Sequence, residues 1–169
     1  MKHIKSIHTF LNPEYCVNET TLETRYSAGI AIIFDGKVLL GHSSGRRADT
    51  ASFGISKGGI DAGESKLEAA IRETREEFGI KVPKSLIDKQ EYTFVVTSRK
   101  YKYNKVVYYY IAEIKSLSQI GLKDLVVPKK QLQIKEVDYA KFMTRDEAQK
   151  AIMQSQRTLL QNLTTKGLI

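Results

Sequence analysis

Cysteine is almost absent from this sequence: Cys16 is the only one, so no disulfide can form within the chain. A lone cysteine is typical of a reducing compartment, and we expect a cytoplasmic protein with Cys16 as a small, partly buried side chain. No apolar run approaches the length of a membrane span, and residues 1–15 lack the continuous apolar core of a signal peptide. We therefore expect no membrane partner.

Internal repeats, low-complexity stretches and linkers long enough to separate domains are also missing. The length of 169 residues suits one domain with a substantial core. Hydrophobic residues make up 41% and charged residues 27%, which is ordinary for a soluble globular protein. We expect a single domain over residues 1–169, with residues 1–25 as an N-terminal extension or an edge strand. Nothing in the sequence indicates an oligomeric state.

Negative charge is scarce between residues 97 and 135. This segment has nine lysines or arginines against Glu113 and Asp124, so it carries most of the formal net charge of +8. Such a segment indicates a polyanionic partner, which would be a phosphate compound, nucleic acid or a membrane surface. A solvated lysine-rich surface would give the same composition, so charge alone leaves both interpretations open.

Short β-branched runs and turn residues predict several strands. Residues 27–34 and 37–42 form a hairpin around Asp35–Gly36, residues 92–98 and 106–114 form two strands joined by a basic tip, and residues 138–143 form another. In the run Tyr108–Tyr110 we expect alternate rings to face core and solvent. A helix begins at Gly63 or Ser65 and ends at Gly79, and a capping box at Thr144–Glu147 begins a C-terminal helix over 144–163. Together these elements predict an α+β or α/β domain.

Three carboxylates crowd the first predicted helix. On an ideal helix Glu73, Glu76 and Glu77 lie on one arc, beside a core-facing stripe of Leu67, Ala70, Ile71, Thr74 and Phe78. Each like-charged pair at these spacings costs about 0.2–0.5 kcal/mol. The same geometry makes Arg72 and Arg75 point away from the carboxylates. Grouped oxygen ligands suit Mg²⁺ or Mn²⁺, although a solvated acidic face held by salt bridges is the alternative.

The loop before this helix favours the metal hypothesis. Residues 56–63, SKGGIDAG, contain three glycines, which allow close approach of the backbone to a ligand. The loop leads into a helix N-terminus, where phosphate groups bind well. A glycine-rich loop beside a helix that holds divalent cations suits phosphoanhydride chemistry.

These residues carry a resemblance to the Nudix hydrolases. The Nudix box is matched at eight positions, with Thr74 as the one departure because an aliphatic residue is usual there. The matching residues are Gly58, Glu64, Arg72, Glu73, Glu76, Glu77, Gly79 and Ile80. The resemblance implies an α/β fold, an α/β/α sandwich around a mixed β-sheet, in which residues 58–80 form a loop–helix–loop.

The same resemblance implies an activity and roles for the box residues. Nudix hydrolases cleave a nucleoside diphosphate linked to another moiety. Glu73, Glu76 and Glu77 would bind Mg²⁺, or Mn²⁺ in its place, and the Gly58 carbonyl is a further possible ligand. Glu64 and Arg72 would fix the loop against the helix.

A general base must lie within reach of the attacking water. Glu76 or Glu73 could serve, but many family members use a glutamate from a later loop. The segment beginning at Glu136 resembles that of RNA pyrophosphohydrolases and diadenosine tetraphosphate hydrolases, in which a glutamate stands six residues before Trp; here Phe142 takes the Trp position. Glu136 is therefore our candidate distal base or metal ligand, and Glu113 is its rival.

Five residues are candidates for substrate binding. Lys57, Arg46 and Arg47 flank the glycine-rich loop and could pair with phosphates. Tyr101 and Tyr103 alternate with cations in the basic tip and could stack on a base, unless the tip is only an exposed turn.

A highly phosphorylated nucleotide is the expected partner. It would be a dinucleoside polyphosphate or the 5′-triphosphate end of RNA, with a (d)NTP or diphosphoinositol polyphosphate as alternatives. A non-catalytic module that senses nucleotides or RNA is the remaining alternative, but such a module would be expected to lose box carboxylates, and this sequence keeps them.

Overall fold

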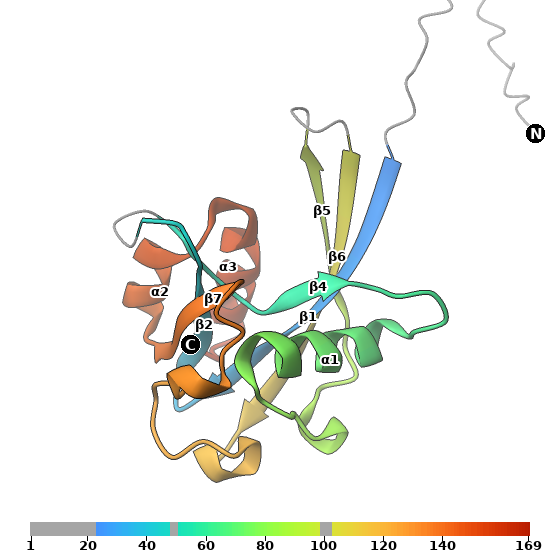
Figure 1. The fold of residues 1–169 in the computed structure, drawn as a ribbon. Coiled ribbons are helices and arrows are strands. Elements are labelled where there is room, and N and C mark those ends of the chain that lie inside the picture. Colours follow the sequence, from blue (N-terminus) through green and yellow to red (C-terminus); the bar gives the residue numbers. More distant parts are fainter. Residues whose placement is uncertain (1–22, 48–50, 99–102) are drawn as a thin grey trace, which may run out of the picture.

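A computed structural model describes residues 23–47, 51–98 and 103–169 of the chain (Figure 1). The strands are β1 (Glu23–Phe34), β2 (Lys37–Ser43), β3 (Phe53–Gly54), β4 (Lys57–Gly59), β5 (Tyr92–Ser98), β6 (Tyr103–Ile114) and β7 (Val137–Met143). The helices are α1 (Lys66–Phe78), α2 (Arg145–Ala151) and α3 (Arg157–Thr165), with 3₁₀ turns at Lys84–Leu86, Leu117–Ile120, Lys129–Gln131 and Gln154–Gln156. None of the helices in the described ranges is long and apolar enough to cross a bilayer.

The strands form one mixed sheet with the main order β3-β2-β1-β6-β5. β1 runs parallel to β6 over its whole length, whereas β2 and β5 are antiparallel to β1 and β6, respectively. β7 pairs with β2, and β4 pairs with β1 through Ala28 and Gly58. Of the expected extension or edge strand, residues 1–22 lie outside the described residues, and residues 23–25 begin β1 and pair with β6.

The predicted hairpin at Asp35–Gly36 is confirmed. Both residues have left-handed backbone angles, with φ of 48° at Asp35 and 67° at Gly36, as a tight two-residue hairpin turn requires. Phe34 pairs with Lys37 directly beyond the turn, and Ile33 pairs with Val38 next. This local turn sets the register between β1 and β2.

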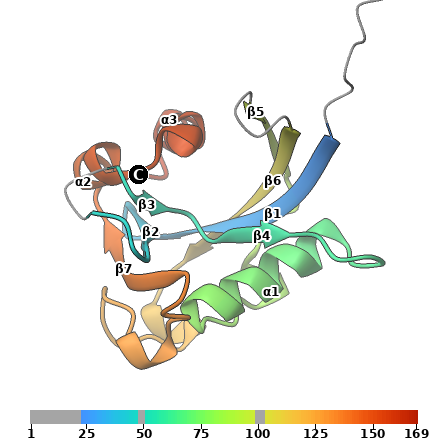
Figure 2. The ribbon, with the colours of Figure 1, turned by 45° about the horizontal axis from the view of Figure 1, so that its top comes forward.

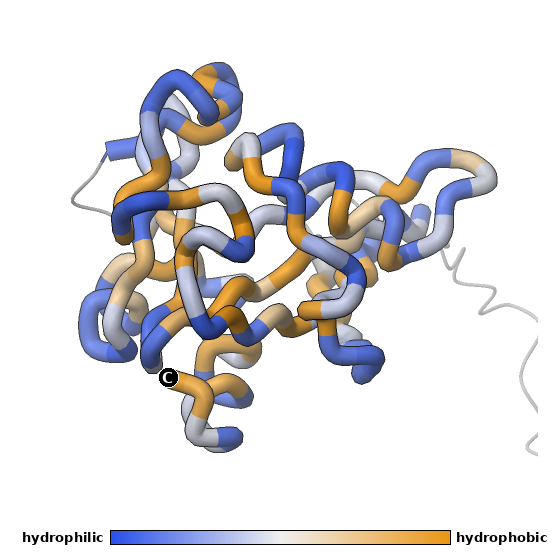
Figure 3. Tube along the Cα trace, turned by 90° about the horizontal axis from the view of Figure 1, so that it is seen from below, coloured by the Kyte–Doolittle hydropathy of each residue, from blue (hydrophilic) through white to orange (hydrophobic). Residues whose placement is uncertain are grey.

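Helices cover both faces of the sheet (Figure 2). α1 lies against one face, where Ile30 and Ile32 of β1 join its buried residues in one core cluster. α2 and α3 lie against the other face, where Ala31 and Ile33 join a second cluster. The hydrophobic colour in Figure 3 runs along the central segments, and the outer turns are mostly hydrophilic. The predicted α/β/α sandwich around a mixed sheet is therefore confirmed.

Burial on both faces corrects the expectation for Tyr108–Tyr110. Tyr109 belongs to the cluster under α3, and Tyr110 to the cluster under α1. Both rings are buried, at 2% and 8% exposure, and Tyr108 is partly buried against the α1 side. Alternate rings thus face two cores rather than core and solvent, because the strand lies in the middle of the sandwich.

The single C-terminal helix expected over 144–163 is interrupted. The capping box is present, since Thr144 and Glu147 exchange hydrogen bonds between side chain and backbone at the start of α2. The helix ends at Ala151, and the capping residue Ile152 has an extended backbone. Met153 N–H then donates to the carbonyl of Phe53 at 2.8 Å. The bridge between Ile152 and Phe53 of β3 thus takes the place of hydrogen bonds that would continue the helix. The next α-helix, α3, begins only at Arg157.

Candidate active site

Local capping residues fix both ends of α1, as predicted. The Ser65 hydroxyl accepts from the backbone of Glu68, and the Glu68 carboxylate accepts from Ser65 N–H. Gly79 ends the helix with φ of 66°. Thr74, the departure from the box, is fully buried, and its hydroxyl donates to the Ala70 carbonyl at 2.9 Å. Threonine therefore packs in the core without an unpaired polar atom.

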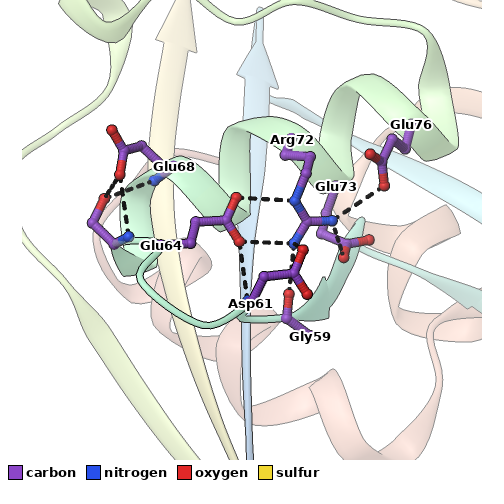
Figure 4. A network of polar contacts seen from close by, with 8 residues as sticks. Gly59, Asp61, Glu64, Glu68, Arg72, Glu73 and Glu76 are labelled. Atoms are coloured by element: carbon purple, nitrogen blue, oxygen red, sulfur yellow. Dashed lines mark hydrogen bonds and ion pairs between the residues drawn. The ribbon is translucent and has the colours of Figure 1, made fainter.

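Arg72 is the centre of a polar network that joins the glycine-rich loop to α1 (Figure 4). Its guanidinium donates to both Glu64 oxygens at 2.9 Å and to the Gly59 carbonyl at 2.8 Å. The bond from Arg72 holds the pKa of Glu64 below its usual range. These contacts are consistent with the loop-fixing role that the resemblance implies for Glu64 and Arg72.

Arg72 also contacts the acidic group, so the expectation that it points away is wrong. One guanidinium nitrogen donates to Glu73 at 2.7 Å and to Glu76 at 3.2 Å. The long side chain of arginine reaches around the helix, which a projection of Cα directions does not represent. Arg72 therefore offsets part of the repulsion among the carboxylates, and its ion pairs raise its own pKa.

Glu73 lies against the backbone of the glycine-rich loop. A Cβ added at Gly58 would overlap the Glu73 carboxylate, so glycine leaves the space that this side chain fills. Only 12% of the Glu73 side chain is exposed, and burial raises its pKa despite the opposing effect of Arg72. Glu76 is more exposed, at 45% of its side chain.

Glu77 is partly buried and has the most perturbed carboxylate of the three. Burial raises its pKa to about 7, against the opposing effects of Lys57 and then Ser56. The Ser56 hydroxyl is close enough to favour the charged carboxylate, yet among the described residues it meets no partner in full hydrogen-bond geometry. A partly buried carboxylate beside an orphaned hydroxyl is suited to binding a further polar group.

The structure brings Glu136 to this group. Glu77, Glu136 and Lys57 line one cavity of about 220 Å³, which we call the carboxylate cavity, together with Gly41, Ser43, Gly54, Ile55, Val137 and Met153. The charge of Glu136 contributes to the raised pKa of both Glu73 and Glu77. The rival residue, Glu113, lines a different cavity with Asp88 and Lys166, and that cavity contains no box residue.

A second cavity, of about 310 Å³, adjoins the first, and we call it the cation cavity. Arg46, Lys57 and Tyr103 line it, so three predicted substrate residues come together. Arg47 is exposed and does not line it, and Tyr101 lies outside the described residues.

Sequence reasoning missed Gln156 of the cation cavity, and it counted Lys105 among the basic residues of 97–135 without assigning it individually to the substrate site. Burial lowers the pKa of Lys105 to about 8, with a further contribution from Lys57. Lys105 could have been noticed as a charged residue that enters the strand before the apolar run of β6, whereas no local signal marks Gln156.

The oxygen donors around α1 fit a divalent cation, although the described side chains do not already converge as a ready-made metal site. Arg72 holds Glu73 and Glu76 through hydrogen bonds from one guanidinium nitrogen. Burial raises the pKa of Glu73 and of Glu77, against the opposing effects of Arg72 and Lys57, respectively, and a bound cation would favour the charged form of both. These three side chains and the Gly58 carbonyl are the donors that could hold a hard cation.

Comparisons with known proteins agree with this geometry. No curated protein matches the chain by sequence. Among solved structures, an Ap4A hydrolase of C. elegans in a binary complex is 21% identical, with a TM-score of 0.59 over 83% of this chain and 96% of that one. A MutT NUDIX hydrolase from Burkholderia pseudomallei is 20% identical, with a TM-score of 0.63 over 82% and 97%.

A NUDIX hydrolase from Nitrosomonas europaea is 17% identical, with a TM-score of 0.63 over 86% of this chain and 91% of that one. At these identities the structures support the fold alone. The family profile of the NUDIX domain matches residues 23–163, which include both cavities and the whole box. The chain therefore belongs to the NUDIX domain family and is a hydrolase of the class that acts on phosphorus-containing acid anhydrides.

Proposed function

We propose that this protein is a Mg²⁺-dependent pyrophosphohydrolase, active also with Mn²⁺, whose substrate is a dinucleoside polyphosphate or the 5′-triphosphate end of RNA. NUDIX hydrolases generally use divalent metal ions. The observation that carries the proposal is the meeting of Glu77, Glu136 and Lys57 in one cavity at the end of the box helix.

Glu73, Glu76, Glu77 and the Gly58 carbonyl would hold the cation. When bound, a divalent cation supplies Lewis-acid stabilisation of charge on the phosphates. The protein contributes a fixed position for the carboxylates, because Arg72 anchors the loop and Gly58 leaves room for Glu73. Lys57, which lines the carboxylate cavity, would pair with a phosphate oxygen next to the reacting bond.

Glu136 is our choice for the distal base or ligand. It lies on an exposed loop before β7, and Gln133 donates to its carboxylate at 3.3 Å. Its main-chain carbonyl accepts from Ser44 N–H at 2.9 Å, which fixes the loop to the end of β2. An exposed carboxylate at the mouth of the carboxylate cavity can accept a proton and release it to solvent. Glu73 and Glu76 are less suited because Arg72 already binds both.

The substrate choice rests on the cations of the adjoining cavity. Arg46, Lys57 and Lys105 line its walls together with the aromatic residues Phe94 and Tyr103. The three cations can bind phosphates, and the two aromatic rings can stack on a nucleobase. An RNA 5′ end and a dinucleoside polyphosphate both present this combination.

The test is release of phosphate or pyrophosphate with Mg²⁺ or Mn²⁺ across a substrate panel. The panel contains dinucleoside polyphosphates, 5′-triphosphate RNA, (d)NTPs and diphosphoinositol polyphosphates. We expect one of the first two classes to be turned over best, and Glu77→Gln to abolish turnover without lowering the melting temperature. Preference for another class would contradict the substrate proposal, and unchanged activity in Glu77→Gln would contradict the assigned site.

A pair of matched variants tests the distal glutamate. Glu136→Gln should lower kcat by about 100-fold, in the range for loss of a general base. Glu113→Gln should have no effect, since Glu113 lies in a cavity without box residues. Equal losses in both variants, or a loss only in Glu113→Gln, would exclude Glu136 from this role.

A further inference from the structure

The carboxylate cavity and the cation cavity meet at two residues. Lys57 and Met153 line both of them. Lys57 belongs to β4, and Met153 lies in the break between α2 and α3. The two cavities therefore adjoin at these side chains, so a ligand long enough to extend past them from the first cavity enters the second.

Positive charge continues beyond this junction. Lys105 and Arg46 line the cation cavity and do not line the carboxylate cavity. Lys105 is only partly exposed, and the charges of Glu73 and Glu77 favour its charged form, although among the described residues neither carboxylate forms an ion pair with it. A bound anion would further offset the cost of burying this ammonium group.

The remaining wall of the cation cavity combines aromatic and aliphatic side chains with the polar Ser155 and Gln156. Phe94 and Tyr109 form an edge-to-face pair with ring centroids 5.9 Å apart. Gln156 is 2% exposed and closes the cavity at the start of α3. Its amide accepts from Ile55 N–H at 2.7 Å and donates to Tyr109 Oη at 2.8 Å. These bonds fix the position of the wall before any ligand binds.

We infer that Lys105 is a specificity-determining residue that selects substrates with three or more phosphates. This inference rests on the proposed function. The phosphates that flank the cleaved bond lie in the carboxylate cavity beside Lys57, and those further along the chain cross the junction to Lys105 and Arg46. Diphosphate compounds do not reach Lys105, so they gain nothing from it.

Met153 controls the passage between the cavities. It has no charge and a flexible side chain, so it can shift to admit a phosphate chain without binding it. A bulky rigid side chain at this position would close the passage and leave the carboxylate cavity intact. Met153 therefore provides a second test that is independent of charge.

The experiment compares steady-state kinetics over a series of nucleotides with an increasing number of phosphates. The series contains a nucleoside diphosphate linked to a sugar, a nucleoside triphosphate, and dinucleoside tri- and tetraphosphates. The variants are Lys105→Gln, Lys105→Arg and Met153→Trp, with Lys115→Gln as the control because Lys115 is exposed just beyond the far end of β6.

In Lys105→Gln we expect KM to rise about 10-fold for substrates with three or more phosphates, with kcat unchanged, as for loss of one charge-assisted hydrogen bond. KM for the diphosphate compound should not change. Lys105→Arg should restore most of the affinity, and Met153→Trp should raise KM for the same long substrates. The control variant should behave as the wild type.

The inference would be overturned if Lys105→Gln raised KM equally for the diphosphate compound and the longer substrates, or changed KM for none of them. Equilibrium binding of the tetraphosphate in EDTA gives a readout without turnover, and Lys105→Gln should weaken it about 10-fold. If the wild type binds these compounds but cleaves none of them with any metal, the proposed function fails. If the wild type cleaves them and Lys105→Gln leaves the series unchanged, only the role of Lys105 fails.

Discussion

The backbone of Gly58 abuts the carboxylate of Glu73, so closely that a Cβ at position 58 would occupy the same space. Gly58 is held in place by pairing with Ala28 of β1, and Glu73 is held by Arg72. The glycine at the start of the box is therefore explained by its steric fit to a carboxylate, since its backbone angles do not require glycine. A larger residue would move the side chain that we assign to the cation.

Gly58→Ala should lower kcat by about 100-fold, which is typical when a catalytic group moves by about 1 Å. The matched control is Gly59→Ala, because a Cβ at Gly59 has no heavy atom within 4 Å among the described residues. In Gly59→Ala the main-chain carbonyl of residue 59 still accepts the hydrogen bond from Arg72. Steady-state kinetics and melting temperatures of both variants provide the test. Equal activity in the two would show that the overlap with Glu73 does not matter.

Arg72→Gln should reduce the free energy of unfolding by about 3 kcal/mol in EDTA. The variant leaves Glu64 and Glu73 without their cation, and both carboxylates are largely buried. Excess Mg²⁺ should recover part of this loss, because a cation replaces the guanidinium at Glu73. Urea unfolding with and without Mg²⁺ measures both effects. The exposed Arg75, as Arg75→Gln, should change stability by less than about 0.5 kcal/mol.

Features encoded by neighbouring residues could be predicted from the sequence. The ends of α1 depend on Ser65, Glu68 and Gly79, and the hairpin depends on Asp35 and Gly36. These residues act through hydrogen bonds and backbone angles within a few positions, so their effect does not need the rest of the fold. The box carboxylates were found for the same reason, since their spacing is local.

Features created by distant contacts could not be predicted. The break after α2 arises because Met153 pairs with Phe53, 100 positions earlier in the chain. The capping box and the apolar spacing of residues 144–163 carry no trace of this competing bond. Lys105 and Gln156 come together only once β6 and the broken helix pack on the same face. Tertiary pairing here outweighs helix propensity.

The left-handed glycine at the end of α1 should be more sensitive than a similar glycine elsewhere. Gly79→Ala places a Cβ 2.7 Å from the Gln131 carbonyl oxygen, a backbone atom that cannot move freely. Gly121 has a similar φ, of 74°, and a Cβ added there would meet no described heavy atom within 4 Å. We expect Gly121→Ala to cost about 1 kcal/mol and Gly79→Ala about 3 kcal/mol. Urea unfolding of the two variants separates the clash from the backbone angle.

The surroundings of Gly79 are also connected to the distal glutamate, Glu136. Gln133 N–H donates to the Glu77 carbonyl at 3.0 Å, so the loop that passes Gly79 continues to Glu136. Gly79→Ala should therefore lower kcat as well as stability, because the clash displaces the same loop. Gly121→Ala should leave kcat unchanged. Loss of stability without loss of kcat in Gly79→Ala would show that Glu136 keeps its position independently of this contact.

The capping glutamate of α2 should make stability depend on acid pH. Glu147 accepts from Lys141 at 2.8 Å and from Thr144 N–H at 2.9 Å, and these bonds lower its pKa to about 2. An unfolded chain has a glutamate pKa of about 4.3, so the folded state favours the charged form. The stabilisation is complete above about pH 5.5 and declines as the pH falls toward 2.

The measurement is urea unfolding of the wild type and Glu147→Gln between pH 7 and pH 3. The difference in free energy between them should be constant at and above about pH 5.5 and shrink steadily below it, since protonation removes the charge that the variant lacks. Lys141→Gln and the double variant complete a cycle, and the coupling between the two side chains should weaken over the same range. A difference at pH 3 as large as at pH 7 would show that Glu147 contributes through its shape at the cap and not through its charge.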